Sequence, residues 1–516
     1  MYSWRAYLGL INPGSGPNME QDFHRFLPRG VALSTTRVPF TYPSPEGLRN
    51  MVAHLEDACE IFKRYKHDVV MFGCTSGSLI GGFDYDKQLI KIIEEITGDQ
   101  GLTTSTAVLE ALGELGVSRP AVITPYPDDT NEVERQFLEH HGFHVVNISG
   151  LGNDYVNQSI TDIEPSHVSA SEKARQARRG LSLYQLFRTQ CAGYHRTAGN
   201  RPEHASRHQQ SGLTVGLSAP RRSGNPHSGT GRAVPQVTQK GRGARLRPFC
   251  REYSCKPHMN LLCHMRRSAT LRQSKYFFDI HTSFIQNCIM TQNTISPVIG
   301  LITMGTSASV ETYFHRHIPP HVEVATTRVA FEEVSYLGLL SMVAQLPAAA
   351  RLLLSARPRV FAIPSMTGSC IKGNEIINVI QQHTGIPTVV PSLEFVNALH
   401  ALNAPRIALV SIFSVELNIL EKLFFATHGI DVRHIIRIEE QIGSEPSQLV
   451  PIDYGMYLDI IAGQMPDEAE AVVVDHPLFV LEEEQRRVYA ERLGRPILST
   501  NEILLDAALR RMETGA

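Results

Sequence analysis

The strongest constraint on the fold is that the chain repeats itself. The stretch that begins at Met19 reads MEQDFHRFLPRGVALSTTRVPF, and the stretch that begins at Val310 reads VETYFHRHIPPHVEVATTRVAF. The second lies 291 positions after the first with no gap, and the same offset pairs GCTSGS at Gly73–Ser78 with PSMTGS at Pro364–Ser369. Self-similarity at a fixed offset indicates tandem structural units, so we expect two copies of one module.

Within each copy, short apolar runs alternate with amphipathic helical patterns. Asp68–Phe72 and Arg359–Ile363 are predicted to be buried parallel strands, and each runs into a loop rich in small hydroxyl residues. Helices are predicted to follow at Leu89–Ile96 and Glu375–Gln382. This alternation predicts an α/β fold with flavodoxin-like, doubly wound parallel sheets, in which the working residues lie on loops at the carboxyl ends of the strands.

The two copies differ in completeness. The second keeps its pattern to the C-terminus, whereas the first loses it after about Ala170. The intervening Ser171–Ile289 carries 21 Lys and Arg against 4 Asp and Glu, while the rest of the chain carries 28 against 47. We therefore divide the chain into a first-copy N-terminal lobe (1–168), a basic insert that we expect to be poorly ordered (169–295) and a complete, two-lobed second copy (296–516).

Two functional interpretations of the basic insert are open. Its clustered arginines would suit a nucleic-acid-binding tail. Its cysteines and histidines would suit a metal site, although their spacing fits no standard zinc pattern. The residues concerned are Cys250, Cys255, His258, Cys263 and His264. We favour neither, and expect no nucleic-acid partner and no metal.

The interpretation that we favour is a frameshifted remnant. In a shifted reading frame the codons of Tyr184–Leu186 are compatible with Ile-Ser-Cys, and those of Ala205–Val215 with PVVTSNQASLW. The latter peptide resembles PILSTNEILLD, which begins at Pro496 in the second copy. Met290 would then be an old start codon, and Ser171–Ile289 would have no selected fold.

One cysteine stands where a predicted buried strand meets its loop. Cys74, surrounded in GCTSGS by hydroxyl side chains and loop amides, is placed to act as a thiolate beside an anion-binding site. The alternative is a small buried structural residue, the commonest fate of a free cysteine. Cys59 and Cys370 lack this setting, so we expect iodoacetamide to modify Cys74 faster than either.

Three motifs resemble one enzyme group. GCTSGS, TTSTAVLEALGELGV (Thr103–Val117) and ITPYPDDTNEVE (Ile123–Glu134) resemble the maleate isomerases and arylmalonate decarboxylases of the aspartate/glutamate (hydantoin) racemase superfamily. The resemblance covers roughly residues 5–165 and 296–516. It implies two similar α/β lobes per module, a site in the cleft between them, and no cofactor. Isomerases and racemases of the group place one cysteine from each lobe on opposite faces of the substrate, whereas the decarboxylases keep only the second-lobe cysteine.

The resemblance assigns roles to first-copy residues. Cys74 corresponds to the first-lobe nucleophile, and Thr75, Ser76 and Tyr126 correspond to groups that hold the substrate carboxylate. Tyr126 could instead be an ordinary half-buried tyrosine. Asn157 matches a substrate-binding asparagine more loosely.

Two expected first-copy residues are missing from the printed sequence. An asparagine of the first loop is replaced by Gly16, with Asn18 as an uncertain substitute. The second-lobe cysteine is absent, and by the shift argument its codon underlies Gln185 and Leu186.

The second copy departs further from the group. Its corresponding site consists of Ser365, Thr367 and His476, and Phe413 stands where the first copy has Tyr126. A Ser365/His476 pair across the cleft is conceivable, but a serine lacks the acidity of a thiol. We therefore favour a divergent or non-catalytic second copy.

The function that we predict is cofactor-independent isomerisation or racemisation of a small carboxylate by thiol chemistry. The chemistry needs donors fixed around an enediolate-like anion, together with thiols that remove and return a proton or add to a double bond. The alternatives are an arylmalonate-type decarboxylase and a non-catalytic small-acid-binding protein. No secretory signal and no apolar run of about 18 residues is evident, so we expect a cytoplasmic protein without a membrane partner, and a homo-oligomer fits the group.

Overall fold

The computed structural model describes most of both copies. It covers residues 5–150, 181–184, 296–438 and 454–514, apart from short gaps at 15–17, 41, 43, 64–65, 306–307, 332 and 477–478. All of these residues belong to one compact unit of the chain. Asn157 and Gly16, and almost all of the basic insert, lie outside the described residues.

The described residues form four sheets in which every strand pairing is parallel. The strand orders are β2-β1-β3-β4, β6-β5-β7, β11-β10-β8-β9 and β13-β12-β14-β15. Counted from the first strand of each sheet, every order begins 2-1-3, and three sheets continue to a fourth strand. This is the flavodoxin-like order, with the first and third strands adjacent at its switch point. The predicted α/β class and doubly wound parallel sheets are confirmed.

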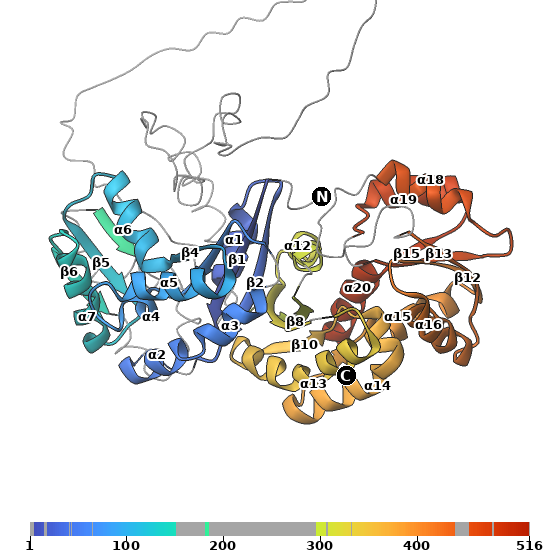
Figure 1. The fold of residues 1–516 in the computed structure, drawn as a ribbon, viewed down its shortest axis with the longest axis horizontal. Coiled ribbons are helices and arrows are strands. Elements are labelled where there is room, and N and C mark those ends of the chain that lie inside the picture. The colour runs from blue at the N-terminus through green and yellow to red at the C-terminus, as the bar shows by residue number, and fades with distance from the viewer. Residues whose placement is uncertain are drawn as a thin grey trace, which may run out of the picture. The chain divides into compact units, whose positions relative to one another are not determined.

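The first copy follows the predicted alternation of strands and helices (Figure 1). The predicted buried strand Asp68–Phe72 is present as β3, within one residue of the expected bounds. The elements of its first sheet are β1 (Ala6–Pro13), α1 (Asn18–Phe26), β2 (Val31–Val38), α2 (Pro45–Val52), α3 (Leu55–Phe62), β3 (Val69–Phe72), α4 (Thr75–Leu79), α5 (Tyr85–Thr97) and β4 (Gln100–Thr103). Those of its second sheet are α6 (Thr104–Glu114), β5 (Pro120–Thr124), α7 (Asp128–His140), β6 (Asn147–Gly150) and β7 (Leu181–Tyr184).

The second copy repeats this plan and continues to a fourth strand in both sheets. Its first sheet comprises β8 (Val298–Met304), α12 (Ala308–His317), β9 (Glu323–Val329), α13 (Tyr336–Leu353), η5 (Leu354–Ala356), β10 (Pro358–Ala362), α14 (Met366–Thr384) and β11 (Thr388–Val389). Its second sheet comprises α15 (Pro391–Ala401), β12 (Arg406–Ser411), α16 (Val415–Thr427), β13 (Asp431–Arg437), α18 (Tyr454–Gly463), β14 (Ala471–Asp475), α19 (Glu483–Leu493), β15 (Ile497–Ser499) and α20 (Thr500–Thr514).

Helices cover both faces of the first sheets. In the first copy Leu48 and Leu89 pack with Ile11 on one face, while Phe23 packs with Leu33 on the other. In the second copy α13 and α14 cover one face and α12 and α20 the other. The apolar strands are therefore buried on both sides, as continuous hydrophobic runs in parallel sheets require.

The α13 helix, together with η5, is the one described segment long and apolar enough to cross a membrane by length and composition. We expected no such run from the sequence, and Gln345, Pro347 and Arg351 do interrupt it. Its buried residues Leu346 and Leu353 pack in the core of the first sheet of the second copy. Such packing is that of a core helix in an α/β sheet.

Strand β7 lies inside the segment for which we expected no selected fold. Leu181–Tyr184 pairs with β5 over four residues and fills the third position of its sheet. The alternation of apolar Leu181 and Leu183 with Ser182 fits a strand at the open edge of β5. The sheet of the first copy therefore includes a strand that lies beyond the predicted boundary at 168.

The fourth strand of that sheet has no counterpart among the described first-copy residues. In the second copy the corresponding strand is β15 (Ile497–Ser499), within the PILSTNE stretch. The peptide restored by the shifted reading frame, PVVTSNQ, matches this same stretch. The frameshift interpretation stays a prediction. The peptide that it restores corresponds to the fourth strand, which the described part of this sheet does not contain.

Candidate active site

The candidate site begins at the loop that follows β3. Cys74 is the N-cap residue of α4, and its side chain is 1% exposed. Its Sγ accepts a hydrogen bond from the Gly77 backbone N–H at 3.3 Å and lies 3.8 Å from Ser76 Oγ. The strand end and the short helix thus hold the thiol among a backbone donor and a hydroxyl.

Hydroxyl side chains fix the position of this loop. Ser78 Oγ donates to the Thr75 carbonyl at 2.9 Å, and Ser105 Oγ donates to the same carbonyl at 3.0 Å. Thr104 Oγ1 donates to the Phe72 carbonyl at 3.2 Å. The TTST residues, Thr103–Thr106, lie at the start of α6. Their hydrogen bonds hold the loop that carries Cys74 in place.

Close packing beneath the loop explains why a glycine precedes Cys74. A Cβ at Gly73 would lie 2.7 Å from Leu10 Cδ1 and 2.8 Å from Met19 Sδ. Both distances are shorter than real Cβ contacts. A larger residue would therefore require the ends of the Leu10 and Met19 side chains to shift.

Tyr126 reaches the same place from the end of β5. Its N–H donates to Thr124 Oγ1 at 3.1 Å, and its carbonyl accepts from Asn131 Nδ2 at 3.1 Å. A Cβ at Gly150 would lie 2.1 Å from that carbonyl, so glycine is required there. The Tyr126 hydroxyl bonds to Ser76, and burial, followed by Glu134, raises its pKa well above the usual range. It remains a neutral O–H donor at any physiological pH.

The structure therefore brings Cys74, Ser76 and Tyr126 together, with Thr75 beside them at the start of α4. Tyr126 is 1% exposed, so it is fully buried rather than half-buried. Asn157 lies outside the described residues. The roles that the resemblance gives these side chains stay predictions.

The expectation that Cys74 is a thiolate near neutral pH is wrong for this geometry. Burial raises the pKa of the Cys74 thiol to about 11, and the bonds from Gly77 and Ser76 lower it only in part. The pKa of Cys59 is raised to about 12, and burial raises that of Cys370 well above its usual range. At this pKa Cys74 is a neutral thiol at neutral pH.

Labelling should show this raised pKa directly. At pH 7 a thiol of pKa about 11 is only about one part in ten thousand thiolate, and the thiolate is the form that reacts. The rate of Cys74 alkylation by iodoacetamide should therefore rise about tenfold per pH unit from pH 7 to 10. Mass spectrometry of the Cys74 and Cys59 peptides measures both rates in one sample. A Cys74 rate that levels off near pH 8 would contradict the buried, neutral thiol.

The first loop of this site is held partly by the second copy. Ser355 Oγ donates to the Gly14 carbonyl at 2.5 Å, and Arg37 Nη1 donates to the Pro13 carbonyl at 3.0 Å. Asn18, the uncertain substitute for a first-loop asparagine, is buried as the first residue of α1. Residues of both copies therefore fix the loop that follows β1.

The second copy keeps the scaffold of this site but changes its chemistry. Phe413 N–H donates to Ser411 Oγ at 3.1 Å, and Asn418 Nδ2 donates to the Phe413 carbonyl at 3.0 Å. This repeats the arrangement around Tyr126 without the phenol hydroxyl. Ser365 is the N-cap residue of α14, and its side chain makes no capping hydrogen bond.

A pair of buried acids at this second site was not predicted from the sequence. Thr367 Oγ1 lies 2.6 Å from Glu421 Oε1 and 3.1 Å from Asp475 Oδ2. Burial raises the pKa of Glu421 well above its usual range, and the neighbouring Asp475 carboxyl raises it further. Two carboxyls this close cannot both ionise, so Glu421 holds a proton. The spacing Asn-x-x-Glu, shared by Asn131–Glu134 and Asn418–Glu421, was the signal that could have found it.

The Ser365/His476 pair across the cleft stays a prediction. His476 is 5% exposed, and burial lowers its pKa to about 3. Its Nε2 lies 3.5 Å from the Tyr457 hydroxyl. The groups that meet at this site are therefore Thr367 and the two acids, and an uncharged His476 stands next to them.

Two features define the class of protein. The sheets have the flavodoxin-like order, and the candidate residues gather at the carboxyl ends of β3 and β5, where open α/β sheets bind small molecules. Residues 8–197 match the arylmalonate decarboxylase family. The resemblance predicted from the motifs is confirmed: this protein is related, at low identity, to maleate isomerases and arylmalonate decarboxylases.

The chain is similar to individual proteins of both kinds. A maleate isomerase of Nocardia farcinica is 26% identical over 188 residues, which cover 35% of this chain and 72% of that protein. An arylmalonate decarboxylase of Bordetella bronchiseptica is 31% identical over 144 residues, which cover 28% of this chain and 56% of that protein. The crystal structure of the maleate isomerase Iso from Pseudomonas putida S16 superposes with a TM-score of 0.38 at 18% identity, covering 42% of this chain and 93% of that one.

Proposed function

We propose that the first copy binds a small carboxylate at Cys74, Thr75, Ser76 and Tyr126, and that, when its second-lobe cysteine is restored, its chemistry is cofactor-independent isomerisation or racemisation through the Cys74 thiol. The observation that carries this proposal is the meeting of a buried thiol, a serine and a buried tyrosine hydroxyl at two strand ends. Kinship with maleate isomerases and arylmalonate decarboxylases supports the same substrate class.

The donors in the site suit a carboxylate. Tyr126 has an O–H that stays protonated, and Ser76 has a hydroxyl bonded to it. Donors that are buried and already oriented interact strongly with an anion, because no water competes and little reorganisation is needed. A carboxylate next to the reacting carbon would delocalise the negative charge that forms there, and these donors would stabilise it.

The raised pKa of Cys74 defines its part in the reaction. A neutral thiol is a general acid that can return a proton to an enediolate-like carbanion. Removing a proton, or adding to a double bond, requires the thiolate, which a pKa of about 11 makes scarce. A single thiol also serves only one face of the substrate, so two-face chemistry needs the second-lobe cysteine that the printed sequence lacks.

A second candidate follows from that missing cysteine. Among the described residues Cys74 is the single thiol near Tyr126, and the second copy has Ser365 and Phe413 in the corresponding places. We therefore keep an arylmalonate-type decarboxylase and a non-catalytic small-acid-binding protein as alternatives. The three share one ligand class, so binding is tested first.

Calorimetric titration of the full chain with maleate tests the proposal. We expect binding of maleate, and a loss of about ten- to a hundred-and-fiftyfold in affinity for Tyr126→Phe, because one hydrogen bond to a charged group contributes about 1.5–3 kcal/mol. Tyr42→Phe is the matched control, because Tyr42 is 44% exposed and lies outside the site. Absence of binding by the unaltered chain, or equal affinities of the Tyr126 and Tyr42 variants, would refute the proposed site.

A further inference from the structure

We infer that the two copies meet through a self-complementary surface with pseudo-two-fold symmetry, and that the partner which this surface fits is a second copy of the same lobe. We call it the paired face. It consists of four residues from each copy: Glu20, His24, Thr35 and Arg37 from the first, and Glu311, His315, Thr326 and Arg328 from the second. Each second-copy member lies 291 positions after its first-copy equivalent and is the same residue type.

The contacts across the paired face are reciprocal. The Thr35 N–H donates to Glu311 Oε2 at 3.1 Å, and the Thr326 N–H donates to Glu20 Oε1 at 3.0 Å. The threonine of each copy thus binds the glutamate of the other. In an isologous interface residue i contacts j while j contacts i, and this is the pattern observed.

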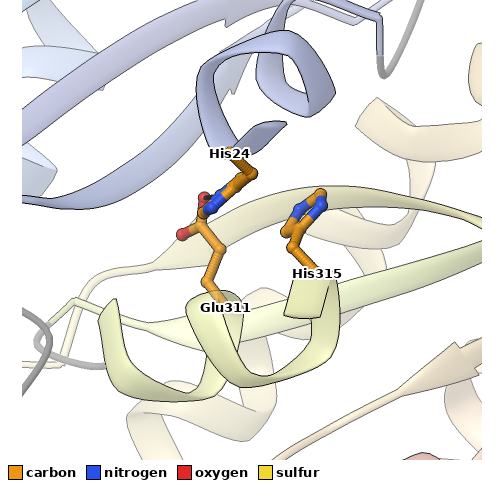
Figure 2. Close-up of side chains that lie close together, drawn as sticks. All are labelled: His24, Glu311 and His315. Carbon is orange, nitrogen blue, oxygen red and sulfur yellow. Dashed lines mark hydrogen bonds and ion pairs between the residues drawn. The ribbon is translucent and has the colours of Figure 1, made fainter. Parts of the chain in front are cut away.

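The histidines obey the same symmetry. His24 Nε2 lies 3.2 Å from Glu311 Oε1, and His315 Nε2 lies 3.1 Å from Glu20 Oε1. The two imidazole rings stack with centroids 3.8 Å apart and an interplanar angle of 13°. Figure 2 shows His24 reaching down from α1 toward Glu311 and His315 on α12. A residue on a two-fold axis meets its own equivalent, so the stacked rings mark the axis.

Each copy also neutralises its own glutamate. Arg37 Nη2 lies 2.5 Å from Glu20 Oε2, and Arg328 Nη2 lies 2.5 Å from Glu311 Oε2; all four side chains are fully buried. A buried charge without a partner costs several kcal/mol, so each guanidinium is needed wherever its glutamate is buried. The network is therefore complete only when two such lobes meet.

A metal site is the competing explanation of this cluster. Ligand atoms of His24, Glu311 and His315 all lie within 4.8 Å of one another. However, both Glu311 oxygens already accept hydrogen bonds, from Thr35 and from Arg328. An added cation would have to compete with a buried guanidinium for the same carboxylate. The reciprocity of the contacts also has no explanation in a metal site.

The symmetry breaks at two places. Thr35 Oγ1 donates to Glu311 Oε1 at 2.6 Å, whereas Thr326 Oγ1 has no hydrogen-bond partner among the described atoms. Arg37 Nε donates to the Thr326 carbonyl at 2.7 Å and its Nη1 to the Pro13 carbonyl, whereas Arg328 Nε and Nη1 have no hydrogen-bond partner among the described atoms. The arginine thus holds the first loop in the copy that has Cys74. In the copy that has Ser365, the corresponding loop is not held by its arginine.

Reciprocal contacts between equivalent residues do not depend on the connecting chain. We therefore expect the two copies to stay associated when that connection is cut. The full-length chain is made with a specific protease site within residues 198–260, purified and cleaved. Size-exclusion chromatography with light scattering at about 10 μM should show one species with the mass of the uncut chain. Separation of the two fragments would overturn the inference.

A charge reversal identifies the surface responsible. His24→Glu places a third carboxylate beside Glu311, and the fragments of this variant should separate after cleavage. His54→Glu is the matched control, since His54 is 50% exposed and pairs only with its neighbour Asp57. Its fragments should stay together. Separation of the control fragments, or association of the His24 fragments, would show that the paired face does not hold the copies.

Thermal unfolding of the uncut chain gives a measurement that does not depend on cleavage. Because the contacts are symmetric, His24→Ala and His315→Ala should lower Tm by similar amounts, and the double variant by less than the sum of the two shifts, since the rings contact each other. A shift from only one of the two variants, or additive shifts, would overturn the inference. A Tm that rises with added zinc in the unaltered chain but not in His24→Ala would overturn it in favour of the metal site.

Discussion

A chain in which the shifted reading frame is restored, so that residues 184–186 read Ile-Ser-Cys, is expected to convert maleate, whereas the chain as printed is expected only to bind it. Sequencing the encoding DNA across codons 165–225 comes first, because it shows whether the shifted frame encodes this peptide. If it does, single-base correction gives the restored chain. If it encodes no such peptide, the frameshift interpretation is refuted and the basic insert is a selected sequence.

Strand pairing supports this expectation. Val122 pairs with Leu183 and Ile123 with Tyr184 on β7, as Val410 pairs with Val474 on β14. In each second sheet the third strand therefore runs beside the first strand and toward the same end. A cysteine restored just after β7 would stand in sequence where His476 stands directly after β14.

Cys74→Ser in the restored chain should lower the rate of maleate conversion at least about a thousandfold, because removing one member of a nucleophile pair costs three or more orders of magnitude. Cys59→Ser is the matched control, since Cys59 is buried in the core on α3 and should leave the rate unchanged. Proton NMR of maleate and its product measures both. Conversion that survives Cys74→Ser would exclude the two-thiol mechanism.

Arg37→Met is expected to lower the free energy of unfolding by about 3–5 kcal/mol, the usual cost of leaving one partner of a buried ion pair without the other. Arg37 is fully buried and holds Glu20, the Thr326 carbonyl and the Pro13 carbonyl at once. Burial alone lowers the pKa of Arg37, and Glu20 is the main group that counteracts it. Methionine fills a similar volume but satisfies none of these acceptors.

Urea denaturation monitored by circular dichroism measures this loss. Lys63→Met is the control, because Lys63 and its partner Glu60 are each 54% exposed and such surface pairs contribute little. Arg37→Met should also weaken maleate binding, since the Pro13–Gly14 loop loses its anchor. A midpoint that matches the Lys63 variant would show that Arg37 is not buried in the paired network.

The local elements followed from the residues themselves. β3 and β10 are present where the apolar runs Asp68–Phe72 and Arg359–Ile363 predict them. Such strands can be predicted from the sequence, because a strand covered on both faces must be apolar at successive positions, whatever packs against it. The repeat and the three motifs likewise established the two copies and the kinship, since both are properties of residue order alone.

The protonation states required the tertiary structure. Cys74 looked like a thiolate because its neighbours in sequence are hydroxyls and glycines, yet the depth of its burial raises its pKa to about 11. Burial is set by helices and strands distant in sequence. The Glu421 and Asp475 pair could not be predicted from the sequence for the same reason. The two residues are 54 positions apart, and they meet because α16, which follows β12, carries Glu421, while the adjacent strand β14 ends at Asp475.

The sequence by itself determined the α/β class, the tandem copies and the residues that could carry the chemistry, because patterning, repetition and motif are local or linear. Only the tertiary structure decided that a strand at Leu181–Tyr184 joins the first copy and that Cys74 is a neutral thiol. It alone decided that equivalent residues of the two copies bind one another. The hydrogen bonds between the copies join residues that are 276 and 306 positions apart, so they depend on how the sheets pack, and no local pattern encodes that packing.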